Sequence, residues 1–173
     1  MLSKSTLVAL LLFASCQAPG TKQAKKYMDL KGFFEKESAR LSQTGVRVAK
    51  TVSRNGLSEN KDNVLPNWET ELSLFTESDI NKAAWRDSYK IVQDSTMTTY
   101  IALDSKLRTR SIEIRKNQQG NLQGITIVNH TANALYSSAE ELIYIPDSIY
   151  RIAKKQDVIL LGNNNYEISG IFK

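Results

Sequence analysis

After Trp85 the sequence consists of short segments of β-forming residues, and their regular spacing constrains the fold more than any other feature. The segments recur about every ten residues, and turn-forming clusters such as Asp94-Ser95 and Pro146-Asp147 separate them. No helical stretch long enough for a parallel crossover intervenes, so neighbouring strands are expected to pair antiparallel. The predicted strands are Tyr89–Gln93, Thr96–Leu103, Leu107–Arg115, Leu122–Asn129, Ala134–Ile145, Ser148–Ala153, Asp157–Leu161 and Asn165–Phe172.

The first half of the chain predicts two helices and a hairpin. Apolar residues recur at helical spacing from Ala24 to Gln43, which indicates an amphipathic helix. Asn55-Gly56, between two alternating segments, predicts a β-hairpin, and Pro66 begins a second helix that ends at Asp79-Ile80-Asn81. The hairpin strands are predicted at Val46–Val52 and Leu57–Val64.

These elements together predict an α+β fold. The expected order is an N-terminal helix, a hairpin, a second helix and then an antiparallel β-meander that forms a curved sheet. At least one helix is expected to pack on that sheet. A small closed β-barrel is the alternative, because eight strands suffice to close one.

The N-terminal residues read as an export signal. Lys4 precedes an apolar run from Leu7 to Phe13, which is seven residues long. A helix that spans a bilayer needs about 20 residues, so this run is too short to remain as a membrane span.

The residues Phe13-Ala14-Ser15-Cys16 resemble the lipobox of bacterial lipoproteins, with Phe13 in place of the usual Leu. The resemblance implies cleavage before Cys16, thioether lipidation of that residue and acylation of the new amino terminus. Gln17 implies an outer-membrane location, and we expect the domain to face the periplasm. The predicted organisation is a lipoprotein signal peptide at residues 1–15, a lipidated tether at 16–23 and one globular domain at 24–173.

The positive charge is concentrated next to this anchor. The whole chain carries a net charge of +5, and residues 17–54 contain nine basic and three acidic residues. An anionic membrane surface would attract such a segment, and an ordinary solvated helix face is the alternative. Nucleic acid is not an expected partner, because no aromatic and glycine-rich recognition motif accompanies the charge.

Catalytic signatures are scarce. Lipidation would consume Cys16, the only cysteine, and His130 is the only histidine, so we expect neither a metal site nor a cofactor. The sequence holds no nucleophile elbow, phosphate loop or zinc-protease helix. Glu140 and Glu141 are adjacent on a predicted strand and would point to opposite faces, which favours a solvated edge or turn over an acid–base pair.

Several short motifs resemble a group of uncharacterised lipoproteins of Gram-negative bacteria. They are Trp68-Glu69-x-Glu71-Leu72-x-x-Phe75, Asp79-Ile80-Asn81-Lys82-x-x-Trp85-Arg86-Asp87-Ser88-Tyr89, Leu103-Asp104-x-Lys106-Leu107-x-x-Arg110 and Glu141-Leu142-x-Tyr144. The resemblance covers most of the chain after Cys16 but implies no activity and no catalytic residue. Arg86 and Asp87 are interpreted as an ion pair between a helix and a strand.

The function expected from these features is that of a non-catalytic envelope lipoprotein that binds a hydrophobic ligand or a protein partner. Aromatic residues would line the space between helices and sheet, or alternatively would fill the core; they are Tyr27, Phe33, Phe34, Trp68, Phe75 and Trp85. The competing hypothesis is an envelope hydrolase with a carboxylate-based or His130-based site.

Overall fold

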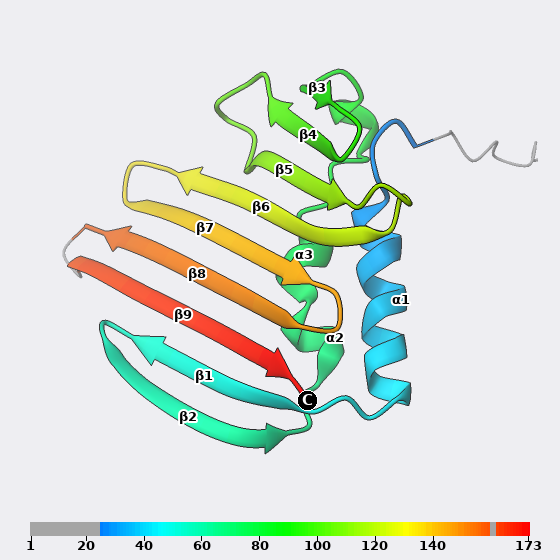
Figure 1. Cartoon of the computed structure of the whole chain (residues 1–173). Coiled ribbons are helices and arrows are strands. Elements are labelled where there is room, and N and C mark those ends of the chain that lie inside the picture. Colours follow the sequence, from blue (N-terminus) through cyan, green and yellow to red (C-terminus); the bar gives the residue numbers. More distant parts are fainter. Residues whose placement is uncertain (1–24, 160–161) are drawn as a thin grey trace, which may run out of the picture.

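A computed structural model describes residues 25–159 and 162–173, so the predicted signal segment and the whole predicted tether, including Cys16, lie outside the described residues. Within these ranges the chain forms one large antiparallel sheet with its helices on one face (Figure 1). The strands are β1 Val48–Arg54, β2 Leu57–Val64, β3 Tyr89–Gln93, β4 Met97–Ala102, β5 Thr109–Lys116, β6 Leu122–Ala132, β7 Tyr136–Ile145, β8 Ile149–Val158 and β9 Gly162–Phe172. The helices are α1 Leu30–Gln43, α2 Trp68–Glu71 and α3 Ser73–Glu77, followed by a 3-10 helix at Ala83–Trp85.

The strand order is β2-β1-β9-β8-β7-β6-β5-β4-β3, and every neighbouring pair is antiparallel. The strands β3 to β9 form the predicted meander, and the β1–β2 hairpin joins it when β1 pairs with β9 (Figure 1). The sheet is open, because β2 and β3 each have only one neighbour. The predicted curved antiparallel sheet is confirmed, and the closed-barrel alternative is wrong. The fold is mostly β, so the α+β class is met only in part.

The predicted hairpin is present, and its turn explains why. Asn55 and Gly56 both have positive φ angles, of 51° and 85°. Two consecutive left-handed residues make the tight turn whose twist matches that of the flanking strands, and Asn-Gly is the pair that adopts it most readily.

The first helix begins six residues later than predicted. The side chain of Asp29 caps its N-terminus by accepting a hydrogen bond from the Gly32 amide at 2.9 Å. Gly45, with a φ of 65°, follows its C-terminus. Residues 25 to 28 are therefore irregular chain, with a bend at residues 26 and 27, and do not belong to the helix.

The second helix predicted after Pro66 is matched only in part, because the structure has two short helices, α2 and α3, with a break at Leu72. The hydroxyl of Ser73 donates to the Thr70 carbonyl at 2.9 Å, and that of Thr76 donates to the Leu72 carbonyl at 3.2 Å. Ser and Thr side chains that bond to nearby carbonyls compete with the regular helical ladder and favour such breaks.

The two strands predicted at Ser148–Ala153 and Asp157–Leu161 are one continuous strand, β8. The charged residues between them do not end the strand, because the pairing with β7 places Lys154 opposite Glu140 and Gln156 opposite Ser138. Complementary neighbours across the ladder hold polar residues within a sheet.

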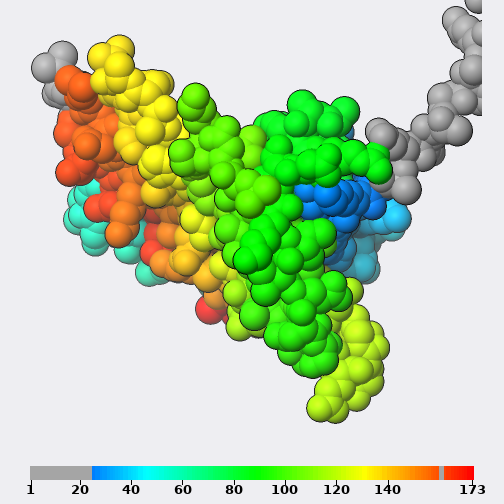
Figure 2. Space-filling view, turned by 90° about the horizontal axis from the view of Figure 1, so that it is seen from above, coloured from blue at the N-terminus to red at the C-terminus, as the bar shows by residue number. Residues whose placement is uncertain are grey.

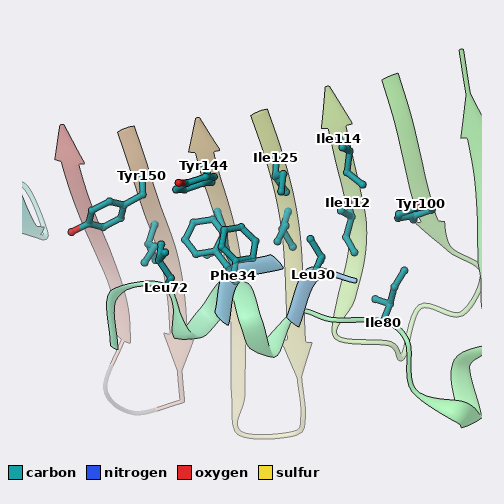
Figure 3. Packing of buried hydrophobic residues seen from close by; sticks show 14 of the residues in the cluster. Leu30, Phe34, Leu72, Ile80, Tyr100, Ile112, Ile114, Ile125, Tyr144 and Tyr150 are labelled. Carbon is teal, nitrogen blue, oxygen red and sulfur yellow. The ribbon is translucent and has the colours of Figure 1, made fainter. Parts of the chain in front are cut away.

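The core lies between the helices and the sheet face that they cover, here called the inner face (Figure 3). Phe34 of α1 packs against Phe75 of α3 with ring centroids 4.9 Å apart and against Tyr144 of β7 at 5.3 Å. Trp68 of α2 contacts Tyr150 of β8 edge to face at 5.8 Å. Edge-to-face and offset contacts of this kind are the favoured geometry for buried rings.

Two buried phenols attach the helices to the sheet. Tyr144 donates to Glu37 of α1, which also binds Arg40, and Tyr150 donates to Glu71 of α2 at 2.8 Å. Lys50 of β1 completes the second group by pairing with Glu71. The carboxylates thereby satisfy phenols that would otherwise be buried without a partner. No helix among the described residues is long and apolar enough to cross a membrane.

Candidate functional site

The inner face changes character along its strands. On β7 the inward-facing residues run from apolar Tyr144 and Leu142 to polar Glu140 and Ser138, and all four are buried. The neighbouring strands change at the same level, since Ile125 and Ile127 of β6 precede Asn129, and Tyr150 and Ile152 of β8 precede Lys154 and Gln156. We call the residues beyond this change the polar end; they are Arg108, Asn129, Tyr136, Ser138, Glu140, Lys154 and Gln156.

The helices cover the apolar part of this face, and α3 ends where the polar end begins. Ser78, which follows α3, accepts a hydrogen bond from the side chain of Asn129 at 2.9 Å. Beyond α3 the hairpin of β6 and β7, coloured yellow, extends to the side of the molecule away from the blue start of the described chain (Figure 2). The polar end therefore lies between the end of α3 and the tip of this hairpin.

Three charged side chains form the centre of the polar end. Arg108 lies 2.9 Å and Lys154 lies 3.2 Å from the carboxylate of Glu140, one on each of its oxygens. The side chain of Glu140 is only 8% exposed, whereas those of Arg108 and Lys154 are 32% and 29% exposed. The anion is thus buried beneath two cations that reach the surface.

Burial alone would raise the pKa of Glu140, but the hydrogen bonds and charges of Arg108 and Lys154 outweigh it and hold that pKa below its usual value. Glu140 is consequently ionised at neutral pH, and all its bonds are made to cations or to Asn129. A carboxylate in this state cannot act as a general acid.

Two polar atoms of the polar end lack partners. Among the described residues, neither Oδ1 of Asn129 nor Oγ of Ser138 makes a hydrogen bond, although both are buried. The Asn129 amide is oriented by its own NH₂ group, which donates to Ser78 and, at 3.4 Å, to Glu140. The Asn129 oxygen is the clearer example of a buried atom without a partner. The Ser138 hydroxyl lies beside the Tyr136 phenol and lowers the pKa of that phenol.

Leaving a buried acceptor unpaired costs about 1–3 kcal/mol, so such groups in a folded protein call for an explanation. The pairing of Gln156 with the Tyr136 hydroxyl at 2.9 Å shows that the surrounding polar side chains are otherwise well matched. The arrangement suits recognition of a polar ligand by hydrogen bonds and charge.

The structure does not assemble the catalytic groups considered from the sequence. Glu140 and Glu141 point to opposite faces, as predicted, but Glu140 lies within β7 and is buried, so the prediction of a solvated edge or turn is wrong for it. Glu141 pairs with Arg151 on the outer face. His130 lies opposite Ala139, which faces away from Glu140, and its ring contacts Arg110 at 3.2 Å.

The predicted ion pair between Arg86 and Asp87 is also absent from the described contacts. Asp87 pairs with Lys26 at 2.7 Å, and the backbone carbonyl of Arg86 accepts a hydrogen bond from the Tyr27 hydroxyl at 2.6 Å. Both contacts join this turn to the start of the described chain.

The aromatic residues predicted to line a ligand site mostly fill the core. Phe34, Trp68 and Phe75 are fully buried, and Tyr27 is 4% exposed. Tyr27 contacts Tyr89 and Tyr100 edge to face, which leaves its ring within the same packed layer. Phe33 and Trp85 are partly buried at the margin of the core. This placement favours the alternative stated above, in which these rings serve packing.

Of the polar end, the sequence analysis considered only Glu140, as part of an acid–base pair, although a signal for the other residues exists. On β6 the alternating series Ile125, Ile127 continues with Asn129, and on β8 the series Tyr150, Ile152 continues with Lys154. Strands that switch from apolar to polar inward positions at one level mark the end of a core. Aligning those switches requires the strand register, which the sequence does not supply.

Cys16, the predicted lipidation site, lies outside the described residues. Within the described residues no three His, Cys, Asp or Glu side chains come together in a way that could hold a metal ion. Comparisons of the chain with protein-family models, with curated proteins and with solved structures found no match.

Proposed function

We propose that this chain is a non-catalytic lipoprotein of the cell envelope that binds a polar ligand at the polar end of its sheet. In this proposal lipid chains on Cys16 hold the domain at the outer membrane, facing the periplasm, as in the Gram-negative lipoproteins that its motifs resemble. The domain presents the polar end of its sheet, and the ligand comes from its surroundings in the envelope.

The observation that carries the proposal is the buried Glu140 carboxylate, held by the partly exposed Arg108 and Lys154, on strands whose other inward positions are mostly apolar. Charges taken out of water lose several kcal/mol of hydration each, and apolar residues of similar volume often stabilise such positions better. Positions that depart from the pattern of their own strand without a gain in stability are the ones expected to serve function.

The ligand class follows from what reaches the surface. Arg108 and Lys154 present partly exposed cations, and the partly exposed Tyr136 and Gln156 present a hydroxyl and an amide group beside them. A ligand with an acidic group and several hydroxyl or amide groups would satisfy both sets. This ligand class replaces the hydrophobic ligand expected from the sequence, because the aromatic rings contact one another in the core.

The test is a native mass spectrum of the lipidated protein purified from membranes in mild detergent. We expect the wild type to retain a species of additional mass and the double variant Arg108→Ala, Lys154→Ala to lose it. A matched double variant, Lys90→Ala with Lys155→Ala, removes two exposed cations elsewhere and keeps the species. A wild type with no bound mass, or a site variant that keeps it, contradicts the proposal.

The anchor is tested separately. Replacing Cys16 with Ala is expected to abolish fatty-acid incorporation and either to release the domain or to leave an uncleaved precursor, because methylenes buried through Cys16 hold the mature protein. Fractionation after metabolic labelling measures both outcomes. A Cys16→Ala protein that incorporates label and reaches the same mass contradicts the anchor.

A further inference from the structure

A shallow basic pocket lies where the described chain begins. It has a volume of about 140 Å³, and its charged lining residues are Lys25, Lys26, Lys82 and Arg86. None of the described residues that line it is acidic. Arg86 of the predicted ion-pair motif thus lines the same cationic surface as Lys25 and Lys26 at the start of the described chain.

Two of the four cations are free to bind a ligand. Lys25 pairs with Asp29, and Lys26 pairs with Asp87. For Lys82 and Arg86, no carboxylate of the described chain lies within ion-pair distance. Lys82 instead lies over the ring of Trp85, with its Nζ 4.1 Å from the ring centroid.

Hydrogen bonds hold the two sides of this pocket together. The amide of Tyr27 donates to the Asn81 side chain at 3.1 Å, and the Asn81 side chain donates back to the Met28 carbonyl at 2.9 Å. The Tyr27 hydroxyl binds the Arg86 carbonyl. The cations of the chain start and those of the turn at residues 82–86 are therefore kept side by side.

The pocket also has a fixed relation to the predicted anchor. Lys25 follows Cys16 by nine residues, which span at most ~30 Å when fully extended. The described chain begins beside α1 and on the helical side of the molecule (Figure 1). Lys25, which lines this pocket, is the first described residue after Cys16.

We propose that this basic pocket docks on the anionic lipid headgroups of the membrane that holds Cys16. The inference rests on the proposed function, because it takes the lipid anchor at Cys16 as given. Lys82 and Arg86 contact headgroup phosphates, while Lys25 and Lys26, each paired with an aspartate, lie beside them.

The test uses the chain from residue 16 onward with Cys16→Ser, which keeps every described residue and carries no lipid. We expect it to co-sediment with vesicles of phosphatidylglycerol and phosphatidylcholine, and not with phosphatidylcholine alone. The double variant Lys82→Gln, Arg86→Gln is expected to partition roughly 30-fold more weakly, at roughly 1 kcal/mol for each cation near an anionic surface. The matched variant Lys61→Gln, Lys155→Gln, with exposed cations elsewhere, stays within about twofold of the parent on the same scale.

Three outcomes overturn the inference. The first is equal binding to both kinds of vesicle, and the second is equal weakening of binding in both double variants. The third is a chain that binds no vesicle but is stabilised by inorganic phosphate, in a way that depends on Lys82 and Arg86. The last outcome identifies a pocket for a small anion in place of a membrane contact. Because the chain carries no lipid, none of these results bears on fatty-acid labelling of Cys16, so failure here is distinguishable from failure of the anchor.

Discussion

The apolar part of the inner face and its polar end are built from the same strands, yet different forces hold them. In the apolar part, the side chains of Leu142 and Tyr144 pack under α1, α2 and α3, and burial of apolar area provides the stability. Glu140 and Ser138, two and four residues before Leu142 on β7, face the same side; Glu140 pairs with two cations, and the Ser138 hydroxyl makes no hydrogen bond among the described residues. The comparison indicates that the apolar part stabilises the fold, whereas the polar end is kept for binding.

The largest expected effect tests the apolar part. Replacing Trp68 with Ala is expected to lower the free energy of unfolding by about 3–5 kcal/mol, because it removes a fully buried side chain and leaves a cavity. Chemical denaturation measures the change. Trp85→Ala, which removes a partly exposed ring, serves as the control and is expected to cost clearly less; equal losses would mean that the helices are not held as described.

Neutralising the Glu140 carboxylate at the polar end is expected to lower the free energy of unfolding by less than the loss of Trp68 does. Glu140→Gln leaves Arg108 and Lys154 without their shared charge, and the expected loss is about 1–3 kcal/mol at neutral pH. Since the pKa of Glu140 is lowered in the folded state, its contribution is present above the ordinary value of 4.5 and is lost as the pH falls below it.

The difference in stability between wild type and Glu140→Gln is therefore expected to narrow below about pH 4.5. Glu141→Gln, on the outer face, is the matched control, and its expected effect is within about 0.5 kcal/mol. A difference that widens in acid would show that the carboxylate is not held in its ionised form.

Tyr144→Phe probes the junction of the helices with the sheet. Loss of the bond to Glu37 is expected to cost about 1 kcal/mol at neutral pH, as for a typical hydrogen bond. Burial, and then the Glu37 carboxylate, raise the pKa of Tyr144 above its ordinary value of 10.0. A raised pKa means that the contribution is complete below pH 10 and is lost as the pH rises further.

Wild type is thus expected to lose stability above pH 10 more steeply than Tyr144→Phe, as measured by denaturation at several pH values. Parallel pH profiles for the two proteins would contradict the assignment of this phenol. Tyr136→Phe, at the polar end, provides a comparison in which the phenol is not packed under a helix.

Much of the fold was predictable from local signals, and the candidate site was not. Turn residues placed the hairpin at Asn55-Gly56 and separated most of the strands, because turn chemistry acts over a few residues. The break at Leu72 involves local bonds from the Ser73 and Thr76 hydroxyls, which helical spacing alone does not reveal. The continuity of β8 through Lys154 depends on its pairing with Glu140 of another strand, β7. The same holds for the polar end, which exists only once register places Arg108, Glu140 and Lys154 together.

The smallest expected effect concerns the unpaired hydroxyl of Ser138. Ser138→Ala is expected to change stability by less than about 0.5 kcal/mol, because the lost group makes no hydrogen bond among the described residues. Ser38→Ala is the matched change in the apolar part, where the hydroxyl donates to the Phe34 carbonyl at 2.8 Å, and is expected to cost about 1 kcal/mol. A large loss for Ser138→Ala would mean that this residue serves the fold.

The most direct test of the account replaces the whole charged network with apolar residues of similar size, as Arg108→Met, Glu140→Leu and Lys154→Met together. Such replacements of buried ionic groups are often neutral or stabilising. We predict that the triple variant unfolds at the same temperature as wild type or higher, while its native mass spectrum lacks the bound species that wild type carries. A triple variant that is strongly destabilised, or one that is stable and still carries the bound species, would contradict the claim that the polar end is kept for binding.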